Sequence, residues 1–187
     1  MKKIPTLFQQ VYKDNEFIGV THELTSPDLQ VVLEGKTIPT VKVDGSCCAI
    51  IDGKFYKRYD AKKGKKPPEG AIPCSEPDPI TGHHPHWVLV DENDSADKWF
   101  VEALKNYKGI ITNATYEAIG VHFQGNPYNL EEDTLYLHGA VRVDLEDLSF
   151  AGIKKYLEEH YIEGIVFWYN NEPLCKIKRK DFGLEWK

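Results

Sequence analysis

The sequence predicts an α+β fold in which the sheets are largely antiparallel and a few helices pack beside them. Short runs of β-branched and aromatic residues are separated by Asp-Gly and Asn-Asn pairs, which are typical of tight hairpin turns. Two other segments repeat apolar residues at the spacing of an amphipathic helix. Because only two helices interrupt a series of strands, the pattern favours α+β over a parallel βαβ arrangement.

Length and composition indicate a single domain over residues 1–187. The chain is 41% hydrophobic and 28% charged, as expected for a soluble globular protein with a sizeable core. No apolar run approaches the length of a membrane span, so we expect no membrane partner. The start, MKKIPTLFQQ, has two lysines but no apolar stretch after them, and it is therefore not expected to be a secretory signal.

The four cysteines are few and unevenly spaced. Cys47 and Cys48 are adjacent, which suits a disulfide framework poorly. We therefore expect reduced thiols, with the two adjacent ones packed as small buried side chains, and a cytoplasmic protein.

Between the first strand and the first helix, the sequence predicts a β-meander followed by a long loop. Residues 41–44 (VKVD) and 47–52 (CCAIID) are rich in strand-forming residues, and Asp52-Gly53 offers a hairpin turn into residues 54–60. Residues 62–86 are so rich in Pro and Gly that we expect an ordered loop or a mobile flap and no regular element.

Two helices and four further strands follow. The first helix is predicted over residues 95–107, capped by Ser95 and ended by Gly109. The second is predicted over residues 149–160, with three apolar side chains inward. The four strands are expected at residues 109–120, 134–144, 162–169 and 174–182, and the last two should be joined at Asn170-Asn171.

Charge is distributed unevenly around a net value of −6. Seven of the thirteen positions from Lys54 to Lys66 are Lys or Arg. A second basic cluster contains Lys176, Lys178, Arg179 and Lys180. A basic groove on an acidic body would suit a polyphosphate ligand, although two solvated basic faces would give the same pattern.

Lys42 stands in a strand that otherwise consists of core residues. It is interpretable as the solvent-facing residue of an alternating strand, as a charge that protects a sheet edge, or as a nucleophile. Alternation places Lys42 and Asp44 on one face, and it likewise places Lys176 and Lys178 on one face with Ile177 opposite. Two lysines beside an apolar residue suggest an anion between them, and a phosphate is the obvious candidate.

An attacking lysine must be neutral, whereas a free lysine titrates near a pKa of ~10.4. Neighbouring cations and desolvation lower that pKa, and Lys176 and Lys178 are candidates for those cations. Glu163 is a candidate ligand for Mg²⁺, which prefers one or two carboxylates together with waters and phosphate oxygens. Lys42 would then attack an α-phosphorus, with pyrophosphate leaving.

The order of four motifs resembles the covalent nucleotidyltransferase superfamily of DNA ligases, RNA ligases and capping enzymes. The motifs are KVDG, TYEAIG, IEGIVFW and CKIKRK, and the resemblance extends from about residue 35 to residue 180. KVDGSC, YEAIGVHFQGNPY and EGIVFW look most like the RNA ligase versions. The resemblance implies sheets that flank a nucleotide cleft, as in an ATP-grasp-like ligase catalytic domain.

The resemblance also implies an activity. The chain would be an ATP-dependent RNA ligase that uses Mg²⁺, with Mn²⁺ as a substitute. It would join 5′-phosphate and 3′-hydroxyl RNA ends, as in RNA repair, through lysyl-AMP and an RNA-adenylate. The catalytic residues implied are Lys42, which carries AMP, Asp44 in the same motif, and Lys176 and Lys178 on the α-phosphate.

Further residues are implied at the nucleotide. Glu163 would be the metal-associated carboxylate, and Glu117 would contact the ribose. His138 would stack on adenine, with Tyr136 as the alternative. The remaining implied contacts are Val41 and Gly45 beside Lys42, and Arg58 near the phosphates or the polynucleotide end.

Two departures from the superfamily pattern bear on this interpretation. DNA ligases and capping enzymes continue into an OB-fold domain, whereas this chain ends shortly after KIKRK, so we expect no C-terminal OB-fold domain. Many members also carry an Arg where this chain has Cys47 and Cys48. A DNA nick ligase, a guanylyltransferase and a non-catalytic module that binds nucleotide or RNA remain alternatives.

Overall fold

The structure is a computed structural model that describes residues 3–79 and 81–187. The chain divides into two compact units, one formed mainly by Asp44–His138 and the other by Ile4–Val43 with Gly139–Lys187. The α+β class and the mostly antiparallel sheets are confirmed. The nucleotide cleft, the single domain and the missing OB-fold domain stay predictions. Within the described residues, no helix combines the length and apolar character needed to cross a bilayer.

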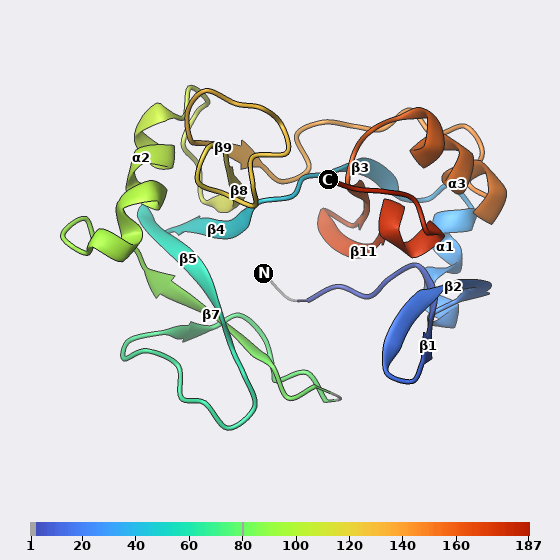
Figure 1. The fold of residues 1–187 in the computed structure, drawn as a ribbon, viewed down its shortest axis with the longest axis horizontal. Helices are drawn as coiled ribbons and strands as arrows, with labels where there is room; N and C mark the ends of the chain where they lie inside the picture. Colours follow the sequence, from blue (N-terminus) through green and yellow to red (C-terminus); the bar gives the residue numbers. More distant parts are fainter. Residues whose placement is uncertain (1–2, 80) are drawn as a thin grey trace. The chain divides into compact units, whose positions relative to one another are not determined.

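The unit formed by Ile4–Val43 and Gly139–Lys187 has two antiparallel sheets (Figure 1). β1 pairs with β2, and the three-stranded sheet has the order β11-β10-β3. We call this part the lysine unit, because it carries Lys42. Its elements are β1 (Phe8–Lys13), β2 (Glu16–Leu24), a 3-10 turn (Pro27–Leu29), α1 (Gln30–Leu33), β3 (Ile38–Lys42), α3 (Phe150–Glu159), β10 (Gly164–Tyr169), β11 (Glu172–Lys178) and a second 3-10 turn (Arg179–Phe182).

One apolar core holds the lysine unit together. It lies on one face of the three-stranded sheet, where α3 supplies fully buried side chains. The sheet contributes alternate residues, as expected for strands with a single buried face. The fully buried members from these elements are Ile153, Leu157, Ile165, Phe167, Cys175 and Ile177.

The other unit, which we call the histidine unit because it carries His138, is built on a six-stranded sheet. Its strand order is β6-β7-β5-β4-β8-β9, and α2 packs against one face. Its elements are β4 (Ser46–Ile51), β5 (Lys54–Ala61), β6 (Ile72–Pro73), β7 (His84–Leu89), a 3-10 turn (Ser95–Asp97), α2 (Lys98–Asn106), β8 (Ala114–Ile119) and β9 (Thr134–Leu137).

The side chains of Cys47 and Cys48 lie on opposite faces of the six-stranded sheet. Cys48 joins the core beneath α2, together with Tyr116 and Ala118. Cys47 points to the opposite face, where it packs in a smaller cluster with Trp87. The expectation that both thiols are packed is confirmed, and all four cysteines are free.

Of the two N-cap residues predicted for the helices, one is confirmed. Ser149 caps α3 as predicted, since its hydroxyl accepts a hydrogen bond from the Gly152 N–H at 3.1 Å. Ser95 was the wrong cap for the other helix. The Asp94 carboxylate accepts from the Ala96 N–H at 2.9 Å, and a 3-10 turn precedes α2.

One loop prediction and two strand predictions need correction. Residues 62–86 contain β6 and the first half of β7, because the pairing of β7 with β5 and of β6 with β7 overrides the Pro- and Gly-rich composition. The strand expected over residues 109–120 begins only at Ala114, and the strand expected over 134–144 ends at Leu137. Both hairpin turns are confirmed, with positive φ angles at Asp52-Gly53 and Asn170-Asn171.

The last predicted strand also stops early, and Arg179 explains why. β11 ends at Lys178, and the Arg179 side chain turns inward to a position only 8% exposed. Its guanidinium donates to the carbonyl oxygens of Leu157, His160 (3.0 Å) and Glu185 (2.7 Å). It therefore satisfies acceptors left at the end of α3, and it is not part of a basic cluster that faces a ligand.

Replacing Arg179 with Ala should destabilise the protein by about 3 kcal/mol, because several buried carbonyl oxygens lose a charged donor. Thermal or urea unfolding measures this loss. Lys180→Ala is the matched control, since Lys180 is exposed, and it should change the free energy of unfolding by less than about 0.5 kcal/mol. Equal effects of the two substitutions would contradict the structural role of Arg179.

Candidate functional site

Three predicted lysines share one face of the three-stranded sheet in the lysine unit. In the register of this sheet, Lys42 and Lys178 both lie opposite Gly164, while Lys176 lies opposite Val166. Residues that pair across antiparallel strands project to the same face. The predicted alternation of lysines with Ile177 is therefore confirmed, because Ile177 lies in the core on the other face.

The Lys42 amine contacts the Glu163 carboxylate. Lys42 Nζ lies 2.6 Å from Glu163 Oε2, and the two side chains are only 22% and 12% exposed. Glu163 immediately precedes β10, which pairs with β3, so backbone pairing brings two residues 121 positions apart into contact. The formal charge of the three lysines and Glu163 is +2, which favours an anionic ligand on this face.

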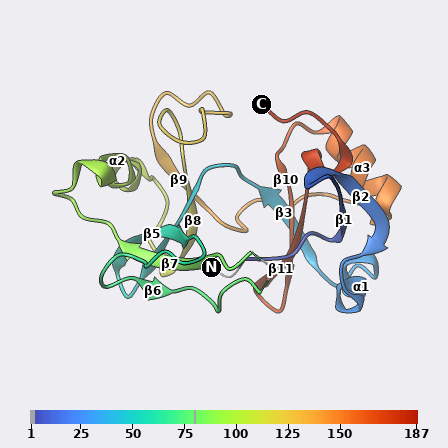
Figure 2. The ribbon, with the colours of Figure 1, turned by 60° about the horizontal axis from the view of Figure 1, so that its bottom comes forward.

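The strands that carry these lysines, β3 and β11, both pair with β10, and the three strands are labelled in Figure 2. Each of the two outer strands also has a partner on its other edge. Residues 141–143 bond to the free edge of β3, with the Val41 N–H donating to the Val141 carbonyl at 2.9 Å. Residues 5–7 bond to the free edge of β11, with the Leu7 N–H donating to the Lys176 carbonyl at 2.8 Å. The lysines thus stand on a frame with little freedom to shift.

Gly164 is required at the centre of this row. A Cβ at position 164 would lie 2.2 Å from the Ile177 carbonyl oxygen, a distance that real contacts do not reach. The glycine therefore permits β11 to approach closely, and it leaves no side chain between Lys42 and Lys178.

Val41 and Trp168 lie on opposite faces of the same sheet. The Val41 side chain packs against the apolar core, and its predicted contact with a nucleotide stays a prediction. Trp168 shares the face of Lys42, and its indole N–H donates to the Thr40 hydroxyl at 2.9 Å. Neither this hydrogen bond nor Thr40 was anticipated from the sequence.

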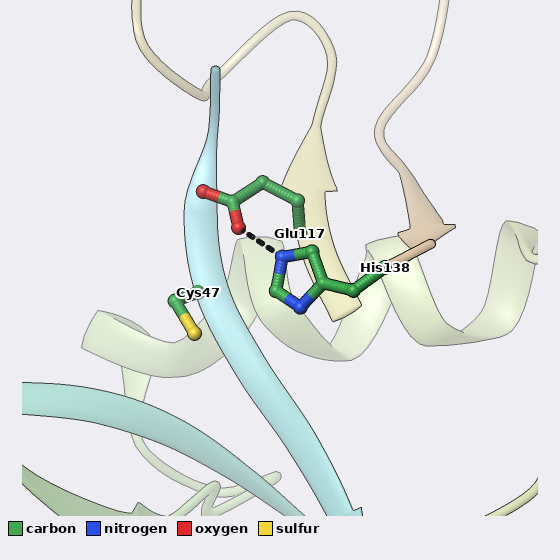
Figure 3. A group of neighbouring side chains, drawn as sticks. All are labelled: Cys47, Glu117 and His138. Atoms are coloured by element: carbon green, nitrogen blue, oxygen red, sulfur yellow. Dashed lines mark hydrogen bonds and ion pairs between the residues drawn. The ribbon is translucent and has the colours of Figure 1, made fainter. Parts of the chain in front are cut away.

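In the histidine unit, Glu117 and His138 are brought together as a hydrogen-bonded pair. His138 Nε2 lies 2.7 Å from Glu117 Oε2, and Nδ1 lies 2.9 Å from the Thr115 hydroxyl. Both ring nitrogens are therefore engaged, so the plane of the imidazole is held. Cys47 pairs directly with Glu117 across β4 and β8 and completes the group (Figure 3).

Two other predicted residues occupy the same face of the six-stranded sheet. Tyr136, the alternative stacking residue, pairs with Glu117 across β8 and β9. Arg58 lies two residues beyond Tyr56, which pairs with Ala49 on the face of Cys47. Arg58 is exposed, and its charge acts on the Cys47 thiol.

Asp44 and Gly45 follow the end of β3 and are held by the histidine unit. The Asp44 N–H donates to the Tyr128 hydroxyl at 2.6 Å. A Cβ on Gly45 would lie 2.3 Å from the Ala118 carbonyl oxygen, so the close approach that requires this glycine is made by β8. Tyr128 had no role in the sequence interpretation, because an 84-residue separation hides the contact.

The thiols in these cores are poor nucleophiles. Burial, together with the nearby Glu117 carboxylate, raises the pKa of Cys47 to about 12, while Arg58 opposes the rise. Burial also raises the pKa of Cys175 to about 12. These thiols are protonated at neutral pH, which leaves Lys42 as the stronger candidate for covalent chemistry.

Comparisons with known proteins place this geometry in context. No family model matches the chain. It is 26% identical to RNA ligase 1 of Pongo abelii over 240 residues, which cover 89% of this chain and 72% of that protein. It is 27% identical to RNA ligase 1 of both Rattus norvegicus and Mus musculus over 222 residues, which cover 80% of this chain and 68% of each relative.

These similarities support an RNA ligase family. They span both units of the chain, so the RNA ligase similarity is not confined to one sheet. The coarser prediction, a ligase that acts on RNA, is thereby supported. The covalent intermediate, ATP, Mg²⁺ and the residue roles stay predictions.

Tyr128→Phe should free the Asp44 amide without altering the fold, because the substitution removes only the accepting oxygen. The loss of one hydrogen bond, about 1 kcal/mol, corresponds to amide exchange at Asp44 that is about fivefold faster. Hydrogen exchange read by NMR measures it. Tyr12→Phe is the control, since the Tyr12 hydroxyl is exposed and bonds to Gln10. Unchanged exchange at Asp44 in Tyr128→Phe would refute the tether.

Proposed function

We propose that this protein is an ATP-dependent RNA ligase that joins 5′-phosphate and 3′-hydroxyl ends through AMP attached to Lys42. One observation carries the proposal: Lys42 contacts Glu163 on a sheet face that also bears Lys176 and Lys178. A surface lysine of an ordinary strand would not need a partly buried carboxylate or two further lysines beside it. The similarity to RNA ligase 1 proteins supplies the class of reaction.

The first step is the attack of the Lys42 amine on the α-phosphorus of ATP. A P–N bond forms, the P–O bond to pyrophosphate breaks, and the amine loses a proton. In the structure the amine is held by Glu163 at 2.6 Å. Attack therefore requires Lys42 to leave Glu163, and Lys176 and Lys178 would bind the α-phosphate.

Glu163 fits the metal that this chemistry uses. It is a carboxylate at the edge of a cationic face, and Mg²⁺ takes one or two carboxylates together with phosphate oxygens. The ion, or Mn²⁺ in its place, would neutralise phosphate charge when bound. Glu163 would then exchange the Lys42 ammonium for the ion, which would release the amine.

Two further steps complete the reaction. The RNA 5′-phosphate attacks the phosphorus of Lys42-AMP, so that a phosphoanhydride forms and the P–N bond breaks. The 3′-hydroxyl of the other RNA end then attacks the activated phosphate, a phosphodiester forms and AMP leaves. Lys42 regains its proton and returns to its starting state.

The histidine unit would recognise the nucleoside and the polynucleotide. Glu117 would contact the ribose, and His138 would stack on adenine, because hydrogen bonds at its ring edge leave a ring face for a base. Tyr136 remains the alternative for stacking. Arg58 is exposed on the same sheet and would bind phosphates. The free thiols fit a reducing compartment, and we propose the cytoplasm.

Lys42→Ala should reduce the transfer of label from α-phosphate-labelled ATP to protein to the background level, because the variant lacks the attacking amine. Denaturing gels detect the covalent label. Lys36→Ala is the matched control, since Lys36 is an exposed lysine of the same unit, and it should be labelled like the wild type. Covalent label retained in Lys42→Ala would remove the mechanism.

Glu163→Gln should slow the same label transfer by about 10²–10³-fold, the usual effect of removing one preorganised charge from a reacting site. The measurement is the initial rate at saturating Mg²⁺. Glu159→Gln is the control, because Glu159 is exposed on α3 and pairs with Lys155. A normal rate in Glu163→Gln would exclude the carboxylate from the reaction. Comparing ATP with GTP, and RNA ends with DNA ends, separates the ligase from a guanylyltransferase and from a DNA ligase.

A further inference from the structure

Three side chains in the histidine unit converge as potential metal ligands. The Cys47 sulfur, a Glu117 carboxylate oxygen and a His138 ring nitrogen all lie within 4.8 Å of one another (Figure 3). All three side chains are largely shielded, at 8% exposure for Cys47 and 12% and 15% for the other two. We propose that Cys47, Glu117 and His138 form a binding site for a thiophilic divalent cation such as Zn²⁺.

Backbone pairing enforces this convergence. Cys47 and Glu117 are directly opposed in the pairing of β4 with β8, two strands with partners on both sides. His138 follows β9, and its N–H donates to the Thr115 carbonyl at 3.2 Å, which extends the pairing of β9 with β8. The three ligands therefore come from three adjacent strands of one sheet, and a site on such a frame is already organised.

The donor set selects a particular class of metal. Zinc binds thiolate sulfur at about 2.3 Å and imidazole nitrogen or carboxylate oxygen at about 2.0–2.2 Å, whereas Mg²⁺ takes oxygen ligands. Tetrahedral coordination separates the ligand atoms by roughly 3.3–3.6 Å. The 2.7 Å hydrogen bond between His138 and Glu117 would lengthen slightly and the sulfur would move inward, changes that side-chain rotation supplies.

A neighbouring hydroxyl selects the ring nitrogen that would bind. His138 Nδ1 lies 2.9 Å from the Thr115 hydroxyl, which can accept its proton. Nε2 is hydrogen-bonded to the Glu117 carboxylate, so a cation bound at Nε2 would take the place of the proton between the two groups. Metal-binding histidines in proteins usually have such a partner on the other ring nitrogen, which fixes the tautomer.

Three protein ligands leave the fourth position of a tetrahedral ion open, as in catalytic zinc sites. Arg58 is the cation that acts on Cys47 from the neighbouring strand, and the charges of Glu117 and a Cys47 thiolate would more than offset it. All three ligands belong to the histidine unit, whereas Lys42 and Glu163, the residues of the proposed magnesium site, belong to the lysine unit.

This site has a consequence that rests on the proposed function. Glu117 and His138 are also the residues proposed to bind ribose and adenine, and they cannot hold a metal and a nucleoside at once. Zn²⁺ would therefore compete with ATP, so label transfer to protein would stop when the site is filled and resume after chelation.

Titration of the metal-free full chain with Co²⁺ tests the site directly, because a thiolate bound to Co²⁺ absorbs in the near ultraviolet. The wild type should give this band, and Zn²⁺ should displace it. Cys47→Ser should lack it, whereas Cys48→Ser should keep it, because Cys48 faces the opposite core. Melting of the metal-free variants checks their folding, and His138→Gln is a second ligand variant that should weaken Zn²⁺ binding by more than about tenfold.

No band in the wild type, or an unchanged band in Cys47→Ser, would overturn the site whatever the activity. A Cys47-dependent band with label transfer insensitive to Zn²⁺ would support the site and overturn the competition. Protein freed of Zn²⁺ and Co²⁺ that takes no label from ATP in the presence of Mg²⁺ would count against the proposed ligase function, and the Co²⁺ band would still decide the metal site.

Discussion

The contact between the Lys42 amine and the Glu163 carboxylate is the interaction on which the functional account depends. It exists because β3 pairs with β10 in a register that sets Lys42 opposite Gly164, one residue after Glu163. The same register places Lys178 on the other side of Gly164. A shift of one residue would turn Lys42 toward the apolar core, so the chemistry is tied to the strand pairing.

The ion pair also constrains the proposed mechanism. In the structure Glu163 occupies the Lys42 amine at 2.6 Å. Under the proposed mechanism this contact must open before Lys42 can react. The KVDG motif is divided between the two units, because their boundary falls between Val43 and Asp44. Lys42 belongs to one unit, while Asp44 and Gly45 are held by Tyr128 and β8 of the other.

Local patterns in the sequence were enough for several features. The Ser149 cap, the Asn170-Asn171 turn and the alternation around Ile177 depend on residues near one another in the chain, and each is present. The α+β class followed from the same local signals. Such signals act over a few residues and are not easily overridden when they agree.

The misplaced cap at Ser95 was a local error, whereas the larger failures share one physical cause, which is contact between residues far apart in the sequence. His84–Leu89 became a strand because β5 and β6 supply partners, although its flanking sequence is typical of a loop. Arg179 looked like part of a basic cluster, but carbonyl oxygens at the end of α3 draw it inward. The group of Cys47, Glu117 and His138 was equally hidden, because it forms only when three strands align.

Peptide mapping by mass spectrometry after incubation with ATP and Mg²⁺ is the most direct test of the central claim. The account predicts a single AMP adduct, labile to acid as a phosphoramidate is, on the peptide that contains Lys42. RNA joining without an adduct, or an adduct on a different residue, would contradict it.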